Sequence, residues 1–245
     1  MSNHLYGGLA GKVRWFVRRF GAAELLLVPA RAAMSAAVIP FLARRTFHAA
    51  GVEHSYFYHR YNATWANERC VEVPLARAFL AQAPGAAALE IGHVLGHYAP
   101  VPAPVTHTVL DKYERATGVV NADILEYQPG RTFDRIASIS TFEHIGFDDE
   151  TAGDSGEKIL AAIAATRALL APGGVFWLSA PLSYNPELDA LIGRDALGAR
   201  RMSFMQRTQR RLWEEAPWSA VCGARYMHPY PFANALIIAE FDAAR

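Results

Sequence analysis

From residue 87 onward, short apolar runs alternate with longer amphipathic stretches. Four such runs follow one another along the chain: Ala87–Gly92, Thr108–Asp111, Arg135–Ser140 and Val175–Ala180. Between the last two lies Gly156–Gly174, an alanine-rich stretch that ends in Pro-Gly-Gly and predicts a helix. Short buried strands separated by helices are typical of a parallel sheet covered on both faces. We therefore expect a doubly wound α/β fold.

The N-terminal part of the chain has a different pattern. Apolar positions recur at helical spacing from Val13 to Phe20, and Leu25–Leu42 is a second apolar stretch kinked by its prolines. We predict that residues 1–70 form a basic, aromatic-rich helical extension. The α/β domain would then run from residue 71 to residue 245, with a first helix over Val71–Ala83.

The C-terminal segment predicts an antiparallel element. Two apolar stretches, Ala220–Tyr226 and Ala235–Phe241, flank a proline-rich loop. This spacing predicts a hairpin at the edge of the sheet.

Charge is distributed unevenly along the 245 residues. Residues 1–50 hold seven basic residues against Glu24, a balance of +6, and the other 195 residues hold 17 basic and 22 acidic ones, a balance of −5. An acidic domain disfavours a nucleic-acid partner. The basic segment leaves two interpretations open: peripheral contact with an anionic membrane, or a solvated face combined with a lid or dimer contact.

The cellular location follows from weaker signals. Cys70 and Cys222 are too few for a disulfide framework and fit a reducing cytoplasm. No secretory signal is predicted. The apolar stretch Ala22–Leu42 contains Glu24, Arg31 and two prolines, so we do not expect it to span a membrane.

A glycine turn after the first predicted strand and an acid after the second point to a ligand site. Gly92 allows a sharp turn, and Asp111 lies about 20 residues further on, where a carboxylate accepts hydrogen bonds from a ribose in doubly wound folds. A dinucleotide site would need a glycine where this chain has Val94. We therefore favour a nucleoside without a pyrophosphate over NAD.

These segments together resemble the motifs of class I S-adenosylmethionine-dependent methyltransferases. The matching segments are ALEIGHVLG (Ala88–Gly96) for the glycine motif, VLDKYE (Val109–Glu114) for the acid after strand two, ADIL (Ala122–Leu125) for the adenine segment, Phe133–Phe147 for the fourth-strand motif and Leu169–Pro181 for the fifth strand. The resemblance implies a Rossmann-like, mostly parallel seven-stranded sheet with an antiparallel final strand, and S-adenosyl-L-methionine as cofactor. His93, Val94 and His97 depart from the glycine motif.

The resemblance also implies which residues hold the cofactor. They are Glu90 and Gly92 beside the methionine part, Asp111 at the ribose, Asp123 and Ile124 at the adenine, and Ser140 and Thr141 beneath the sulfonium. His93, Gly96 and Lys112 complete the predicted set.

Catalytic candidates follow predicted strands four and five. His144 is the leading general base, and Glu143 and Tyr184 are further candidates; each has an alternative role in capping, packing or a turn. The candidates for acceptor contact are Tyr58, Tyr61, Asn185, His228 and Tyr230. The aromatic stretch around Tyr58 fits either a lid over the pocket or an element docked on the sheet. For Asn185 the alternative is turn chemistry before Pro186.

Two further alternatives concern metal and turnover. His93 and His97 are four residues apart, but no HExxH motif or cysteine pair accompanies them, so no metal site is predicted. The predicted activity is methyl transfer to an oxygen or nitrogen of a small-molecule or glycan-type acceptor. The alternative is a degenerate protein that binds the nucleoside or a partner without turnover, because Val94 alters the glycine motif.

Overall fold

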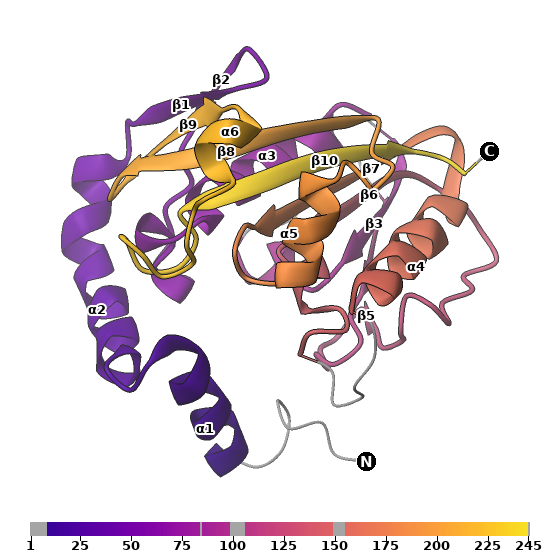
Figure 1. The fold of residues 1–245 in the computed structure, drawn as a ribbon. Helices are drawn as coiled ribbons and strands as arrows, with labels where there is room; N and C mark the ends of the chain where they lie inside the picture. The colour runs from indigo at the N-terminus through magenta and orange to yellow at the C-terminus, as the bar shows by residue number, and fades with distance from the viewer. Residues whose placement is uncertain (1–8, 84, 99–105, 149–154, 245) are drawn as a thin grey trace.

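The computed structural model describes residues 9–83, 85–98, 106–148 and 155–244. Its centre is an eight-stranded sheet in the order β5-β4-β3-β6-β7-β10-β8-β9 (Figure 1). The strands are β3 (Ala87–Ile91), β4 (Thr106–Leu110), β5 (Val119–Val120), β6 (Phe133–Ile139), β7 (Leu170–Pro181), β8 (Arg201–Gln209), β9 (Leu212–Ala216) and β10 (Ala235–Asp242). The strands from β5 to β7 pair in parallel, whereas β10 is antiparallel to both β7 and β8.

The strand order reverses between β3 and β6. From β3 the chain continues to β4 on one side, and it later returns to β6 on the other side. In open α/β sheets, a crevice forms at such a switch point, outside the carboxyl ends of the strands. The predicted doubly wound fold is confirmed, and its topology places the site.

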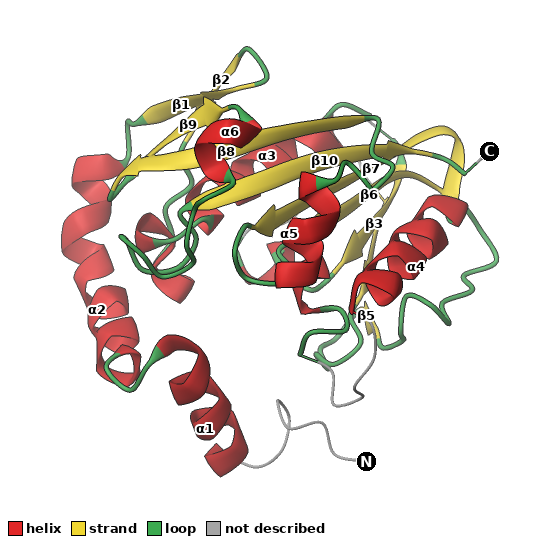
Figure 2. Ribbon diagram, viewed as in Figure 1, coloured by secondary structure: helices red, strands yellow, loops and turns green. Residues whose placement is uncertain are grey.

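Helices cover both faces of the sheet. Figure 2 shows α4 (Ser155–Ala168), α5 (Pro186–Gly193) and α6 (Trp218–Val221) in front of it and α3 (Arg69–Ala81) behind it. Apolar side chains of the central strands alternate between two core clusters, as along β10, where Ile237 packs with the helices in front and Leu236 with α3. Burial on both faces explains why these strands are continuous apolar runs.

The expectation for the C-terminal hairpin was wrong. Residues 220–226 form the end of α6 and a turn, and β10 lies inside the sheet between β7 and β8. The edge partner of β8 is instead β9, which makes eight strands in place of seven. The run Ala235–Ala239 is buried on both sides, and such a two-sided burial needs a central position.

The N-terminal part begins with two helices, α1 (Leu9–Phe20) and α2 (Glu24–Leu42). The prolines do not divide α2, which continues through both of them. The prediction of a helical extension is wrong for the next segment. There β1 (Thr46–Ala49) and β2 (Val52–Ser55) form a separate two-stranded sheet. A 3₁₀ segment, η1 (Tyr61–Ala66), then leads to α3. Among the described residues, α2 is long and apolar enough to cross a membrane by length and composition alone.

Candidate functional site

A cavity of about 690 Å³ lies at the switch point, outside the carboxyl ends of β3, β4, β5 and β6. Its lining residues come from the loops after these strands and from two helices: Ile91, Gly92, His93, Val94, Leu110, Asp111, Lys112, Tyr113, Ala122, Asp123, Ile124, Leu125, Ser140, Thr141, His144, Ile145 and Asp148, with Phe16 from α1 and Lys158 from α4. Segments that are up to 142 positions apart in the sequence therefore share one wall. Most of the predicted cofactor residues line this cavity.

Gly92 turns the chain at the end of β3. Its φ of +88° is a conformation that side chains rarely adopt. A Cβ at this position would also lie 2.1 Å from Oγ1 of Thr141, which follows β6. The two loops at the switch point can approach this closely only because residue 92 has no side chain.

Glu90 stabilises the loop that follows Gly92 but does not line the cavity. The side chain is completely buried, and its Oε1 accepts hydrogen bonds from the backbone N–H groups of Val94 (2.8 Å) and Leu95 (2.7 Å). Its Oε2 lies 3.0 Å from Nε2 of His107 on β4. Its observed role is to hold the backbone that follows Gly92.

Asp111 connects the loops after β3 and β4. Its Oδ2 accepts a hydrogen bond from the N–H of His93 (3.0 Å), and its Oδ1 accepts from the N–H groups of Tyr113 (2.8 Å) and Glu114 (2.7 Å). A carboxylate offers about four acceptor positions, so one remains for a ligand hydroxyl. The side chain therefore positions the loop and still faces the cavity.

Lys112 and Asp123 form an ion pair across the cavity wall. The Lys112 Nζ lies 2.9 Å from Asp123 Oδ2, while Asp123 Oδ1 accepts a hydrogen bond from the N–H of Leu125. Ile124, which is 8% exposed, presents an apolar surface beside them. This part of the wall offers a carboxylate next to an apolar face.

His93 and His97 lie against the carboxylate of Glu114. The distance from His93 Nδ1 to Glu114 Oε1 is 2.7 Å, and the distance from His97 Nε2 to the same oxygen is 3.0 Å. Gly96 lies directly beneath His93, since a Cβ there would be 2.2 Å from His93 Nε2. The three side chains have the donor types of a metal site, with ligand atoms within 4.8 Å of one another. Glu114 is a third residue beside the two histidines that their spacing did not indicate, and the expectation of no metal site stays a prediction.

Tyr61 lies next to this group. Its ring stacks on that of His97 with a centroid distance of 5.0 Å, and it meets Tyr98 edge-on at 5.6 Å. Tyr58 lies deeper and stacks on Tyr56, and neither Tyr58 nor Tyr61 lines the cavity. The aromatic stretch thus packs beside the glycine loop, and Phe16 of α1 contributes to the cavity wall instead.

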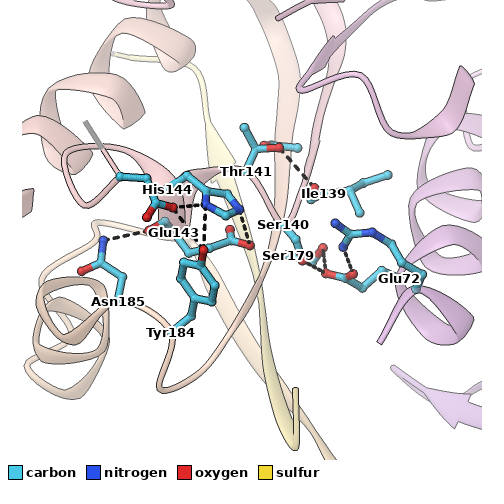
Figure 3. Close-up of polar contacts among 12 residues, drawn as sticks. Glu72, Ile139, Ser140, Thr141, Glu143, His144, Ser179, Tyr184 and Asn185 are labelled. Carbon is cyan, nitrogen blue, oxygen red and sulfur yellow. Dashed lines mark hydrogen bonds and ion pairs between the residues drawn. The ribbon is translucent and has the colours of Figure 1, made fainter. Parts of the chain in front are cut away.

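His144 is the centre of a polar cluster at one end of the cavity (Figure 3). Its Nδ1 forms a hydrogen bond with Asp148 Oδ2, and the Tyr184 hydroxyl lies 3.2 Å from the same nitrogen. The Tyr184 hydroxyl donates to Asp148 Oδ2 at 3.1 Å. On the other side of the ring, Nε2 lies 3.7 Å from Glu143 Oε1. The three predicted catalytic candidates are therefore in one cluster, to which the structure adds Asp148.

The electrostatics of this cluster hold protons near neutral pH. Burial raises the pKa of Glu143 to about 7, although the charge of His144 acts in the opposite direction. Burial acts to lower the pKa of His144, but its hydrogen bond with Asp148 and the charge of Glu143 outweigh this, so the pKa is raised. His144 lines the cavity and is therefore the member of this pair that can exchange a proton with a ligand there.

Ser140 connects the end of β6 to α3. Its φ is +41°, an unusual backbone conformation for a residue with a side chain. Its hydroxyl donates to Glu72 Oε1 at 2.7 Å, and Ser179 at the end of β7 donates to the same oxygen at 2.7 Å (Figure 3). Glu72 is completely buried and is also paired with Arg69. This network holds the turn that carries Ser140 and Thr141 at the cavity.

Three predicted acceptor contacts lie outside the cavity lining. Asn185 caps α5 by accepting from the N–H groups of Glu187 and Leu188, and its Nδ2 donates to the Glu143 carbonyl oxygen at 3.0 Å. The structure therefore shows Asn185 as a helix cap, and its contact with an acceptor stays a prediction. Tyr230 packs under the guanidinium of Arg207 at 5.2 Å, and the backbone N–H of His228 bonds to the Arg225 carbonyl.

Another tyrosine of the same C-terminal loop contacts the His144 cluster. The Tyr226 ring meets that of Tyr184 edge-on, with a centroid distance of 5.1 Å. Asp148 was also missed by the sequence analysis, although its position four residues after His144 is a usable signal. Glu72 offered none, because its partners Ser140 and Ser179 lie 68 and 107 positions away.

Comparison with known proteins gives a consistent but distant picture. No family model and no curated protein matches the chain. Similar solved structures include the N-methyltransferase NodS from Bradyrhizobium japonicum in complex with S-adenosyl-L-homocysteine, at 16% identity over 71% of this chain and 86% of that chain, with a TM-score of 0.46. A TehB-like SAM-dependent methyltransferase from Corynebacterium glutamicum is 20% identical over 69% of this chain and 86% of that chain, with a TM-score of 0.41.

The glycopeptide N-methyltransferase MtfA in complex with S-adenosyl-L-homocysteine is a third similar structure. It is 16% identical over 69% of this chain and 86% of that chain, with a TM-score of 0.36. At these identities and TM-scores the likeness assigns no reaction to this chain. These three solved structures are methyltransferases, two of them in complex with S-adenosyl-L-homocysteine and the third described as SAM-dependent.

Proposed function

We propose that this chain is an S-adenosylmethionine-dependent methyltransferase acting on an oxygen or nitrogen of a small-molecule or glycan-type acceptor. The observation that carries the proposal is the cavity at the switch point, with Asp111 after β4 and Asp123 after β5 on its wall. Its volume of about 690 Å³ is in the usual range of small-ligand sites, roughly 300–1,000 Å³.

The residues of the cavity fit an adenosyl group with a sulfonium. Asp111 keeps one acceptor position for a ribose hydroxyl, and Asp123 beside Ile124 offers an acceptor next to an apolar face for the adenine. Three carboxylates, those of Asp111, Asp123 and Asp148, line the cavity and offer acceptors to the hydroxyl and amino groups of a nucleoside. These contacts agree with the cofactor roles that the sequence resemblance implies.

The polar cluster provides the proton chemistry. S-adenosylmethionine supplies an activated methyl group on its sulfonium when it is bound. Asp148 accepts the Nδ1 hydrogen bond of His144, which leaves Nε2 of the neutral imidazole free to accept a proton from an acceptor hydroxyl or ammonium. Glu143, 3.7 Å from Nε2, stabilises the imidazolium that results.

Calorimetry with S-adenosyl-L-homocysteine tests the site without knowledge of the acceptor. We expect micromolar binding to the wild type and a loss of about tenfold to a hundredfold in Asp111→Asn, because a hydrogen-bonded carboxylate contributes roughly 1.5–3 kcal/mol. Asp134→Asn is the matched control, since Asp134 accepts a backbone hydrogen bond from Ala87 at the opposite end of β3.

A second variant separates binding from loop stability. Asp111 also holds three backbone N–H groups, so Asp123→Asn is measured alongside it. Weakened binding in both variants supports the proposal. Absence of nucleoside binding to the folded wild type, or equal affinity in all four proteins, contradicts it.

A degenerate binding protein is the second candidate function. Val94 lines the cavity at the position where the methyltransferase motif has a glycine, so a side chain stands where the motif leaves none. This candidate predicts nucleoside binding with no transfer of a labelled methyl group to any component of a cell extract. Incorporation of label that His144→Gln abolishes favours the enzyme.

A further inference from the structure

The orientation of α2 is inverted relative to a helix packed on a soluble domain. Its buried residues include Glu24, Arg31 and Ser35, which are 5%, 7% and 0% exposed. In contrast, Leu26 is 77% exposed and Phe41 is 86% exposed. A surface helix in water normally buries its apolar stripe and exposes its polar one.

The inward polar residues are satisfied by partners on the protein. Arg31 forms a bidentate ion pair with Glu24, in which the distance from Nη2 to Oε1 is 2.9 Å. The guanidinium lies 5.4 Å from the ring centre of Phe232, and the Trp65 indole N–H donates to Ser35 Oγ at 2.9 Å. The inverted orientation is therefore built by specific contacts with η1 and the C-terminal loop.

The outward apolar residues of α2 are distributed from one end of the helix to the other. Leu27, Met34 and Phe41 are seven residues apart and so lie along one line of the helix. Leu25 and Leu26 widen this line at the N-terminal end of α2. Exposed apolar surface of this extent marks an interaction site.

Basic residues flank α2 on both sides in the sequence. Arg14 and Arg18 on α1 and Arg44 and Arg45 after α2 are all exposed. The single acidic residue within residues 1–50, Glu24, is neutralised by Arg31. An apolar stripe between basic flanks matches a bilayer with anionic headgroups. A second copy of the chain would bring two sets of arginines together and be repelled.

We propose that the outward face of α2 binds an anionic lipid bilayer, with the helix lying in the interface. The contacts of Ser35 with Trp65 and of Arg31 with Phe232 hold α2 at the surface of the protein, along one side of the molecule in Figure 1. A helix held in this way contacts lipid along its outer face and does not cross the bilayer. The proposal is independent of the proposed methyl transfer, because it rests on α2 and its basic flanks.

Vesicle sedimentation of the full chain tests this surface. We expect binding to vesicles of phosphatidylcholine mixed with phosphatidylglycerol, and weaker binding to phosphatidylcholine alone. Leu26→Glu and Phe41→Glu should each weaken binding to the vesicles about tenfold or more. Each replaces an apolar side chain that would be buried in the lipid with a charged one. Val120→Glu is the matched control: Val120 is 39% exposed on β5, the edge strand opposite β9.

Leu26 and Phe41 are exposed in the protein, so both glutamate variants should fold. Circular dichroism checks this. Binding that Leu26→Glu and Phe41→Glu leave unchanged would overturn the proposal, as would no binding to mixed vesicles at low salt. A wild-type dimer in sedimentation that Phe41→Glu converts to a monomer would assign the face to a second copy and would also overturn it.

Discussion

A Cβ on Gly92 would lie 2.1 Å from Oγ1 of Thr141. The two residues follow neighbouring parallel strands, β3 and β6, on either side of the point where the strand order reverses. This close approach sets the width of the cavity floor, because both residues line it. The glycine is therefore required twice, once for its φ of +88° and once for the space it leaves.

Gly92→Ala should weaken nucleoside binding and destabilise the fold. The positive φ costs about 1–2 kcal/mol, and the contact with Thr141 adds about 1–3 kcal/mol of overpacking. Gly118→Ala isolates the first contribution, since Gly118 has a φ of +82° and a Cβ added there would meet no atom within 4 Å. Denaturant unfolding measures the free energy of unfolding of both variants. Equal losses of this free energy would show that the contact with Thr141 adds no cost to Gly92→Ala.

Glu143→Gln should lower the pKa of His144. The charge of Glu143 is one of the causes that raise this pKa, and the amide removes that charge. An NMR titration of the histidine ring signals measures the change, with His144→Gln to assign the signal. Glu215→Gln serves as control because Glu215 accepts from the backbone of Ala50, far from the cluster. An unchanged His144 titration would contradict the arrangement in Figure 3.

Glu143 should also make stability depend on pH. Its pKa is raised by burial from 4.5 to about 7, so the stabilising contribution is complete below pH 4.5 and is lost as the pH rises through 7. We expect Glu143→Gln to remove this loss and to gain at most about 3 kcal/mol over the wild type at pH 8. Thermal unfolding of the wild type and of Glu143→Gln between pH 5 and pH 8 measures this difference in stability. The same dependence of stability on pH in both proteins would count against a buried, proton-binding Glu143.

Asn185→Ala should destabilise the protein without changing nucleoside affinity. Asn185 caps α5 and bonds to the Glu143 carbonyl, but it does not line the cavity. Loss of an N-cap costs about 1–2 kcal/mol. Asn185→Ser retains a capping oxygen and should recover part of the stability in denaturant unfolding. A large drop in nucleoside affinity with unchanged stability would contradict this capping role.

Local sequence was sufficient for four strands of the parallel half of the sheet, but not for the two-residue β5. The runs that became β3, β4, β6 and β7 are short, apolar and bounded by turn residues, and such a pattern leaves few alternatives to buried strands. Because parallel strands share one carboxyl edge, the positions of Gly92 and Asp111 directly after two of them were enough to predict that they lie at one site.

The sequence by itself thus determined the fold class and most of the cavity wall, since strand periodicity and strand ends are local properties. Tertiary structure alone decided three other features: the central place of β10, the pairing of Glu72 with Ser140, and the inverted face of α2. Each depends on a partner far away in the chain. A helix pattern shows which residues are apolar, but only the packed neighbours decide which side faces the protein.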